Sequence, residues 1–166
     1  MGLWHCYYGL WNGIHPRHHL DDETARGLVR TAKGKILPGD GPGGAGAFYT
    51  PFLQSVKDAG FDFVKIDVQA EYLKHADGRD NPVRHNTKCS EALEQACLKT
   101  GLSLVNCMAQ GTVNIQNTRY SAVTRCSIDY KLGDEAMAKS HILQSYANTL
   151  WLGQTVWPDH DMFHST

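Results

Sequence analysis

The chain has 166 residues, with 16 Lys and Arg against 17 Asp and Glu, and a formal net charge of −1. This length fits a single domain, and the lack of a basic excess argues against nucleic acid as a partner, because binding phosphates requires cationic side chains. Hydrophobic residues make up 42% of the chain, as in ordinary globular proteins. No apolar run approaches the ~20 residues of a membrane span, so we expect no membrane partner.

The five cysteines are odd in number and contain no C-x-x-C pair. We therefore expect free thiols in a reducing compartment, and neither disulfides nor a structural zinc site. The N-terminal residues lack the basic stretch and apolar core of a signal peptide, which leads us to expect a cytoplasmic protein.

The first part of the chain is irregular in pattern. Residues 1–13 predict a strand that runs into a loop, and residues 15–47, rich in glycine and poor in apolar side chains, predict a glycine-rich loop. Thr50 followed by Pro51 is typical of an N-cap and first helical residue, so we expect a helix that begins there and ends before Gly60.

Beyond this point strands alternate with helices. Strands are predicted over 61–68, 102–108, 121–128 and 153–158, and helices over 90–100, beginning at Ser90, and 134–152, with Ala136, Leu143, Ala147 and Leu150 on the buried face. Such alternation indicates an α/β fold with a parallel sheet. In these folds the active site lies at the carboxyl ends of the strands, so polar residues there are the functional candidates.

The first candidate pair is Lys65 and Asp67, near the end of the strand over 61–68. Side chains two residues apart on a strand point to the same face. A charged pair on an apolar strand is costly unless it is paired or used in chemistry. The alternative interpretation is a buried structural ion pair.

The second candidate group is Arg125, Ser127 and Asp129, which would share one strand face. Asp129 follows Asp67 by about two βα units of ~30 residues each, so in a barrel both carboxylates would lie on the same rim. Paired carboxylates across a cleft are the usual equipment of glycoside hydrolysis. Alternatively, Asp129 is an ordinary exposed residue at a strand end.

The third candidate group lies near the C-terminus. Asp159, His160 and Asp161, with His15, His18 and His19, could form a metal site, but histidines in such loops are more often solvated, and we expect no metal. Trp4 and Trp11 could be core residues, or could form the aromatic surface on which a sugar ring stacks.

Six segments, in this order and spacing, resemble the raffinose synthase and seed imbibition protein family, which belongs to the retaining α-galactosidases. They are Gly9–Ile14, Val64–Gln69, Asn106–Met108, Arg125–Asp129, Tyr146–Gly153 and Pro158–Ser165. The resemblance implies part of a (β/α)8 TIM barrel, with about five parallel strands that correspond to barrel strands 3–7, in a single partial catalytic domain over residues 1–166.

The resemblance also implies site residues and no cofactor. It makes Asp67 the nucleophile of a double displacement and Asp129 the acid/base, and it makes Lys65, Arg125 and Asp161 the groups that hold galactose hydroxyls or orient the carboxylates. Asp67 must be ionised, which Lys65 on the same face would favour, while Asp129 must hold a proton, which burial would favour.

The implied substrate is an α-galactoside, a small carbohydrate. Family members commonly have Asp at the position of Ile128 and Trp at that of His160, and because of these differences on the acceptor side we favour hydrolysis over transfer to a sugar. Because a complete barrel needs ~200–250 residues, we expect the chain to be a piece of a longer enzyme that supplies the remaining barrel strands. Two alternatives stay open: a truncated, non-catalytic sugar-binding remnant, and a metal-dependent hydrolase that uses Asp159, His160, Asp161 and His164.

Overall fold

The core of the molecule is one parallel sheet. A computed structural model describes residues 1–76 and 81–161 and has five strands in the order β1-β4-β5-β6-β7. They are β1 (Gly2–Cys6), β4 (Phe63–Asp67), β5 (Ser103–Asn106), β6 (Val123–Arg125) and β7 (Trp157–Asp159). Every neighbouring pair is parallel, and helices connect the strands, which confirms an α/β fold that corresponds to part of a (β/α)8 barrel.

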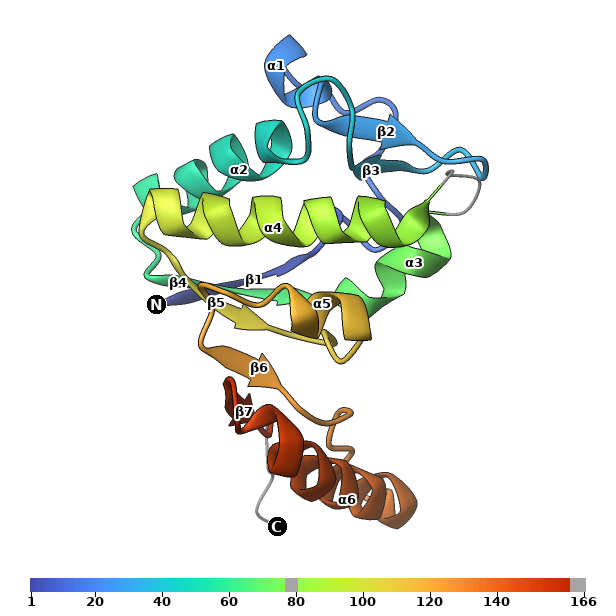
Figure 1. Cartoon of the computed structure of the whole chain (residues 1–166), viewed down its shortest axis with the longest axis vertical. Helices are drawn as coiled ribbons and strands as arrows, with labels where there is room; N and C mark the ends of the chain where they lie inside the picture. Colours follow the sequence, from blue (N-terminus) through green and yellow to red (C-terminus); the bar gives the residue numbers. More distant parts are fainter. Residues whose placement is uncertain (77–80, 162–166) are drawn as a thin grey trace.

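The long helices lie at two ends of the sheet. Figure 1 shows α2 (Gly46–Asp58) and α4 (Pro82–Thr100) side by side over β1, β4 and β5, whereas α6 (Glu135–Leu152) lies beside β7 at the other end. The short elements are α1 (Asp22–Ala25), η1 (Gln69–Glu71), α3 (Tyr72–His75), α5 (Thr112–Gln116) and the antiparallel pair β2 (Leu28–Arg30) and β3 (Ile36–Pro38). In the part of the chain that the structure describes, no helix combines the length and hydropathy needed to cross a bilayer.

The two faces of β4 differ as the alternating pattern predicts. Val64 and Ile66 are completely buried in the core that the sheet shares with α2 and α4. Phe63, Lys65 and Asp67 point to the opposite face, which in a barrel is the interior. The charged residues therefore lie on the face of β4 opposite to the one that packs in the hydrophobic core.

Several predicted boundaries are wrong. The glycine-rich segment 15–47 contains a short helix, a β-hairpin and the start of α2. Helix α2 begins at Gly46, so that Pro51 lies inside it, because burial of Phe48 and Tyr49 stabilises a turn ahead of the proline. Helix α4 begins at Pro82, two turns before Ser90, because the Asn81 side chain accepts the N–H of Arg84 and caps it.

The predicted burial of α6 is also wrong. Ala136, Leu143, Ala147 and Leu150 are exposed, with Leu143 at 67%, whereas the polar residues His141 and Ser145 are buried. The helix therefore turns a polar face toward the loop that follows β6. Hydrogen bonds to that loop, described below, are the physical reason, because they satisfy backbone groups that no apolar face could satisfy.

Candidate active site

Asp67 lies at the carboxyl end of β4, in a position fixed by the pairing of β4 with β1. The parallel register places Trp4 beside Lys65 and Cys6 beside Asp67. The Asp67 side chain is almost buried, with 8% exposed. Its Oδ2 accepts the indole Nε1–H of Trp4 at 3.0 Å, and its Oδ1 accepts the N–H of Val68 at 2.7 Å. Both carboxylate oxygens are thus oriented by donors from the protein.

The backbone just after Asp67 is unusual. Val68 has a φ of 58°, in the left-handed region that β-branched residues rarely adopt. This turn ends the strand and coincides with the hydrogen bond from the Val68 N–H to the preceding carboxylate. Strained backbone of this kind is often found at functional sites, where the surrounding structure maintains it.

A pair of tryptophans lies beside Asp67, because Trp11 packs against the Trp4 ring that binds the carboxylate. The rings of Trp4 and Trp11 lie 5.4 Å apart at an angle of 38°, and both side chains are about half exposed. The structure therefore brings together three residues that the sequence analysis named, and it leaves an open aromatic surface beside a carboxylate.

Asp161 joins the two cations of the site. Its Oδ1 accepts from Lys65 Nζ at 2.6 Å, and its Oδ2 lies 3.4 Å from Arg125 Nη2. Burial lowers the pKa of Lys65, but the hydrogen bond from Lys65 to Asp161 and the negative charge of Asp161 outweigh it, so the pKa of Lys65 is raised. The ammonium group that was expected to act on Asp67 is instead held by Asp161.

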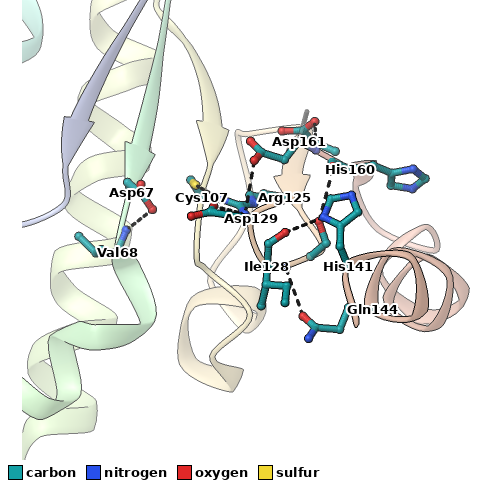
Figure 2. A network of polar contacts seen from close by, with 12 residues as sticks. Asp67, Val68, Cys107, Arg125, Ile128, Asp129, His141, Gln144, His160 and Asp161 are labelled. Atoms are coloured by element: carbon teal, nitrogen blue, oxygen red, sulfur yellow. Dashed lines mark hydrogen bonds and ion pairs between the residues drawn. The ribbon is translucent and has the colours of Figure 1, made fainter. Parts of the chain in front are cut away.

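Arg125 connects this pair to the rest of the site. Its side chain is buried, and its Nη2 donates to Asp129 Oδ1 at 2.5 Å, while its Nη1 lies 3.5 Å from Cys107 Sγ. Figure 2 shows Asp129, Arg125 and Asp161 gathered beside Cys107, which lies on the side toward Asp67. Burial, together with a hydrogen bond to Asp67, raises the pKa of the Cys107 thiol to about 12, so the thiol is protonated at neutral pH.

Asp129 is exposed, whereas the sequence analysis expected it to be buried. Its side chain is 73% exposed, and its nearest charge is the Arg125 guanidinium. Strand β6 ends at Arg125, so the rule that alternate side chains share a strand face no longer applies to Ser127 and Asp129. The two charged residues meet because the chain bends, which brings residues i and i+4 into contact.

Helix α6 holds the loop that carries Asp129. His141 Nδ1 donates to the carbonyl of Ile128 at 2.7 Å, and Gln144 Oε1 accepts the N–H of the same residue at 3.2 Å. Asn148 Nδ2 donates to the carbonyl of Cys126 at 2.6 Å. The sequence analysis did not identify these three polar residues of α6 as part of the site. Their spacing of three to four residues could have identified a polar helix face.

The third candidate group is only partly described. Asp161 belongs to the site above, and His160 Nε2 lies 3.1 Å from the Thr149 hydroxyl on α6. Among residues 1–76 and 81–161, no three His, Cys, Asp or Glu side chains cluster in a way that could hold a metal ion. His164, and with it the last part of the Pro158–Ser165 segment, lies outside the described residues.

Comparison with known proteins identifies the family of the chain. The family model described as "Raffinose synthase or seed imbibition protein Sip1" matches residues 1–166. Two curated proteins of Arabidopsis thaliana, "Probable galactinol--sucrose galactosyltransferase 1" and "6", are each 28% identical over 98% of this chain. The chain spans about a quarter (24%) of the length of these relatives. The chain belongs to the raffinose synthase or seed imbibition protein family.

Proposed function

We propose that the protein cleaves α-galactosides with retention of configuration, through a covalent galactosyl intermediate on Asp67 and with Asp129 as acid/base. The observation that carries this proposal is the set of charged side chains at the carboxyl ends of the strands: Asp161 binds Lys65, which shares a strand with Asp67, and it also contacts Arg125, which binds Asp129. Two carboxylates on one rim are the chemical requirement for this reaction.

The neighbouring residues support a sugar as substrate. Lys65 and Arg125 are donors held in place by Asp161, and such fixed charged groups can bind the vicinal hydroxyls of a hexose. Trp4 and Trp11 present a half-exposed aromatic surface beside Asp67. The apolar face of a galactose ring can pack on such a surface.

The proposed chemistry has two steps. First, an Asp67 oxygen forms a bond to the anomeric carbon while the bond to the leaving oxygen breaks, and Asp129 gives its proton to that oxygen. Second, Asp129 takes a proton from an incoming hydroxyl, whose oxygen bonds to the anomeric carbon and releases Asp67. Two inversions at one carbon give retention.

We propose water as the incoming hydroxyl, because Ile128 and His160 differ from the residues common in family members. A second candidate is transfer of galactose to a saccharide. The observation that favours it is the naming of both curated relatives as galactosyltransferases. The covalent intermediate is the same in both cases.

The test uses Asp67→Ala and Asp129→Ala in the protein expressed from its complete reading frame. Azide should restore activity to Asp67→Ala and give the product of inverted configuration. Asp129→Ala should act only on galactosides with good leaving groups, which need no protonation. Wild-type rates in both variants would refute the proposal.

A further inference from the structure

The loop that carries Asp129 has little support from the main chain. The residues between β6 and α6 form neither a helix nor a strand. At the start of this loop, the Cys126 N–H donates to the Asp159 carbonyl at 2.9 Å. Beyond it, in the part of the chain that the structure describes, no main-chain group of residues 127–130 bonds to another main-chain group. Side chains from elsewhere must therefore hold the loop, because buried main-chain polar groups need partners.

Asp129 does not anchor its own loop. Its side chain is 73% exposed, and among residues 1–76 and 81–161 its carboxylate binds only the Arg125 guanidinium. One contact at the tip of an exposed side chain fixes the main chain weakly, because water competes for the same oxygen atoms. The place of the carboxylate therefore depends on how the residues on either side of Asp129 are held.

A buried histidine contacts both of these residues. His141, on α6, is completely buried, and its Nδ1 donates to the Ile128 carbonyl at 2.7 Å. Because a carbonyl oxygen only accepts, Nδ1 carries a proton. The His141 ring also lies edge-on to the Tyr130 ring, with the ring centres 5.6 Å apart at an angle of 85°. One imidazole therefore contacts the residue before Asp129 and the residue after it.

Gln144 completes the attachment of Ile128. Its Oε1 accepts the Ile128 N–H at 3.2 Å, while its Nε2 donates to the Ser140 hydroxyl at 3.1 Å. The bond to Ser140 directs the amide oxygen toward the loop, since only the nitrogen end of a carboxamide can donate. Figure 2 shows His141 and Gln144 reaching from α6 to Ile128, next to Asp129. Helix α6 thus binds both main-chain polar groups of the residue before Asp129.

We infer that His141 and Gln144 are positioning residues for Asp129, which keep its carboxyl group within reach of the oxygen that leaves in the first step. The inference rests on the proposed function. A proton donor must lie within about 3 Å of the atom that it protonates, and a displacement of roughly 1 Å can lower a rate about 100-fold. Asp67 does not depend on this helix, because both donors to its carboxylate come from outside α6. Loss of either positioning residue should therefore impair protonation and leave nucleophilic attack intact.

The test compares two substrates that differ in their need for a proton. The glucose that leaves melibiose needs one, whereas the nitrophenolate that leaves 4-nitrophenyl α-galactoside does not. In the protein expressed from its complete reading frame, His141→Phe keeps a buried ring and removes the donor. The ratio of kcat/KM for melibiose to that for the nitrophenyl substrate should fall about tenfold or more.

Two further variants separate the hydrogen bond from a general disturbance of α6. His141→Asn places an amide N–H near the position of Nδ1 and should restore the ratio to within about threefold of wild type. Leu143→Phe, at a 67% exposed position on the same helix, is the matched control and should give the wild-type ratio. An unchanged ratio in folded His141→Phe would overturn the inference, as would an equal loss on both substrates, which a purely structural role predicts.

A measurement without substrate covers the case in which His141→Phe does not fold. Gln144→Leu, at a half-buried position, removes only the acceptor of the Ile128 N–H. Hydrogen exchange of the Ile128 amide should then become about tenfold faster or more, while that of Leu104, within β5, keeps its wild-type rate. The ratio for the two substrates should fall in this variant as well. An unchanged exchange rate at Ile128 would overturn the inference.

The proposed function and the inference fail in different ways. If Asp129→Ala leaves the ratio for the two substrates at its wild-type value, the proposed function is refuted and the inference with it. If Asp129→Ala lowers the ratio but folded His141→Phe and Gln144→Leu do not, the inference alone is refuted.

Discussion

The indole N–H of Trp4, on β1, donates to the carboxylate of Asp67, on the neighbouring strand β4, at 3.0 Å. This contact joins an aromatic side chain that is 45% exposed to a carboxylate that is almost buried. Trp4, which we expect to form part of a sugar-stacking surface, therefore also orients the proposed nucleophile.

Trp4→Phe keeps an aromatic ring and removes this donor. We expect kcat to fall about tenfold, because a hydrogen bond to a charged group contributes roughly 1.5–3 kcal/mol, part of which is retained by the Val68 N–H. Steady-state kinetics on an α-galactoside would measure it. Trp11→Phe, which alters only the ring partner, should change KM more than kcat, and an equal fall in kcat in both variants would contradict the assignment.

Asp161→Asn removes the anion between Lys65 and Arg125. Because Lys65 loses the carboxylate that it binds and the buried Arg125 loses one of its two carboxylate partners, we expect a decrease of about 3 kcal/mol in the free energy of unfolding, together with loss of activity. Urea denaturation measures the first effect. Glu135→Gln breaks the fully solvated pair with Lys139 and should cost less than 0.5 kcal/mol. Similar decreases in the free energy of unfolding of the two variants would show that Asp161 contributes no more to stability than an exposed ion pair does.

Glu94→Gln tests a buried carboxylate outside the site. Glu94, on α4, accepts the N–H of Ser121 at 2.8 Å and also the Ser121 hydroxyl, and so holds the segment that enters β6. We expect a loss of about 2 kcal/mol, since an amide replaces an ionised acceptor. Glu91→Gln, one turn earlier at an exposed position, should lie within about 0.5 kcal/mol of wild type in the same urea titration. A loss in Glu91→Gln as large as in Glu94→Gln would contradict this assignment.

The buried thiols predict how stability depends on pH. Burial raises the pKa of Cys89, Cys97 and Cys107 to about 12 and of Cys6 to about 11, from 9.0. Because the folded-state pKa is raised, this stability is complete below pH 9 and is lost as pH rises from 9 toward 12. Between pH 9.5 and 10.5 we expect a loss of roughly 1 kcal/mol per fully buried thiol in the free energy of unfolding.

Urea midpoints at closely spaced pH values measure this slope. Cys89→Ala removes one fully buried thiol and should make the decline less steep, although the variant is less stable at neutral pH. A midpoint that is flat from pH 8 to 11 would show that the thiols are accessible to water. Rapid reaction of all five cysteines with a thiol reagent at pH 8 would show the same.

The alternation of strands and helices could be read from the sequence because each strand has one apolar face that the core requires. Val64 and Ile66 follow this rule, and so do the positions of Lys65 and Asp67 on the other face. The start of α2 could not be predicted, because the burial of Phe48 and Tyr49 depends on contacts with distant parts of the chain.

In the site, the sequence identified Trp4, Asp67 and the charged residues, but not how they pair. Lys65 was expected to serve Asp67 and is bound to Asp161, which lies 96 residues away along the chain. The exposure of Asp129 depends on the exact residue at which β6 ends, and strand ends are the least predictable part of a pattern. Helix α6 was misread because hydrophobic periodicity predicts an apolar buried face, whereas here polar side chains satisfy backbone groups.

The attachment of α6 to the loop after β6 has a consequence for how this protein can change over evolutionary time. His141, Gln144 and Asn148 bind carbonyl and N–H groups that every amino acid other than proline possesses. The side chain of Ile128, which is only partly buried, can therefore be exchanged while the main chain stays where it is. A substitution at position 128 can therefore alter substrate preference without displacing the neighbouring Asp129, so substrate selectivity can change while the proposed acid/base stays in place.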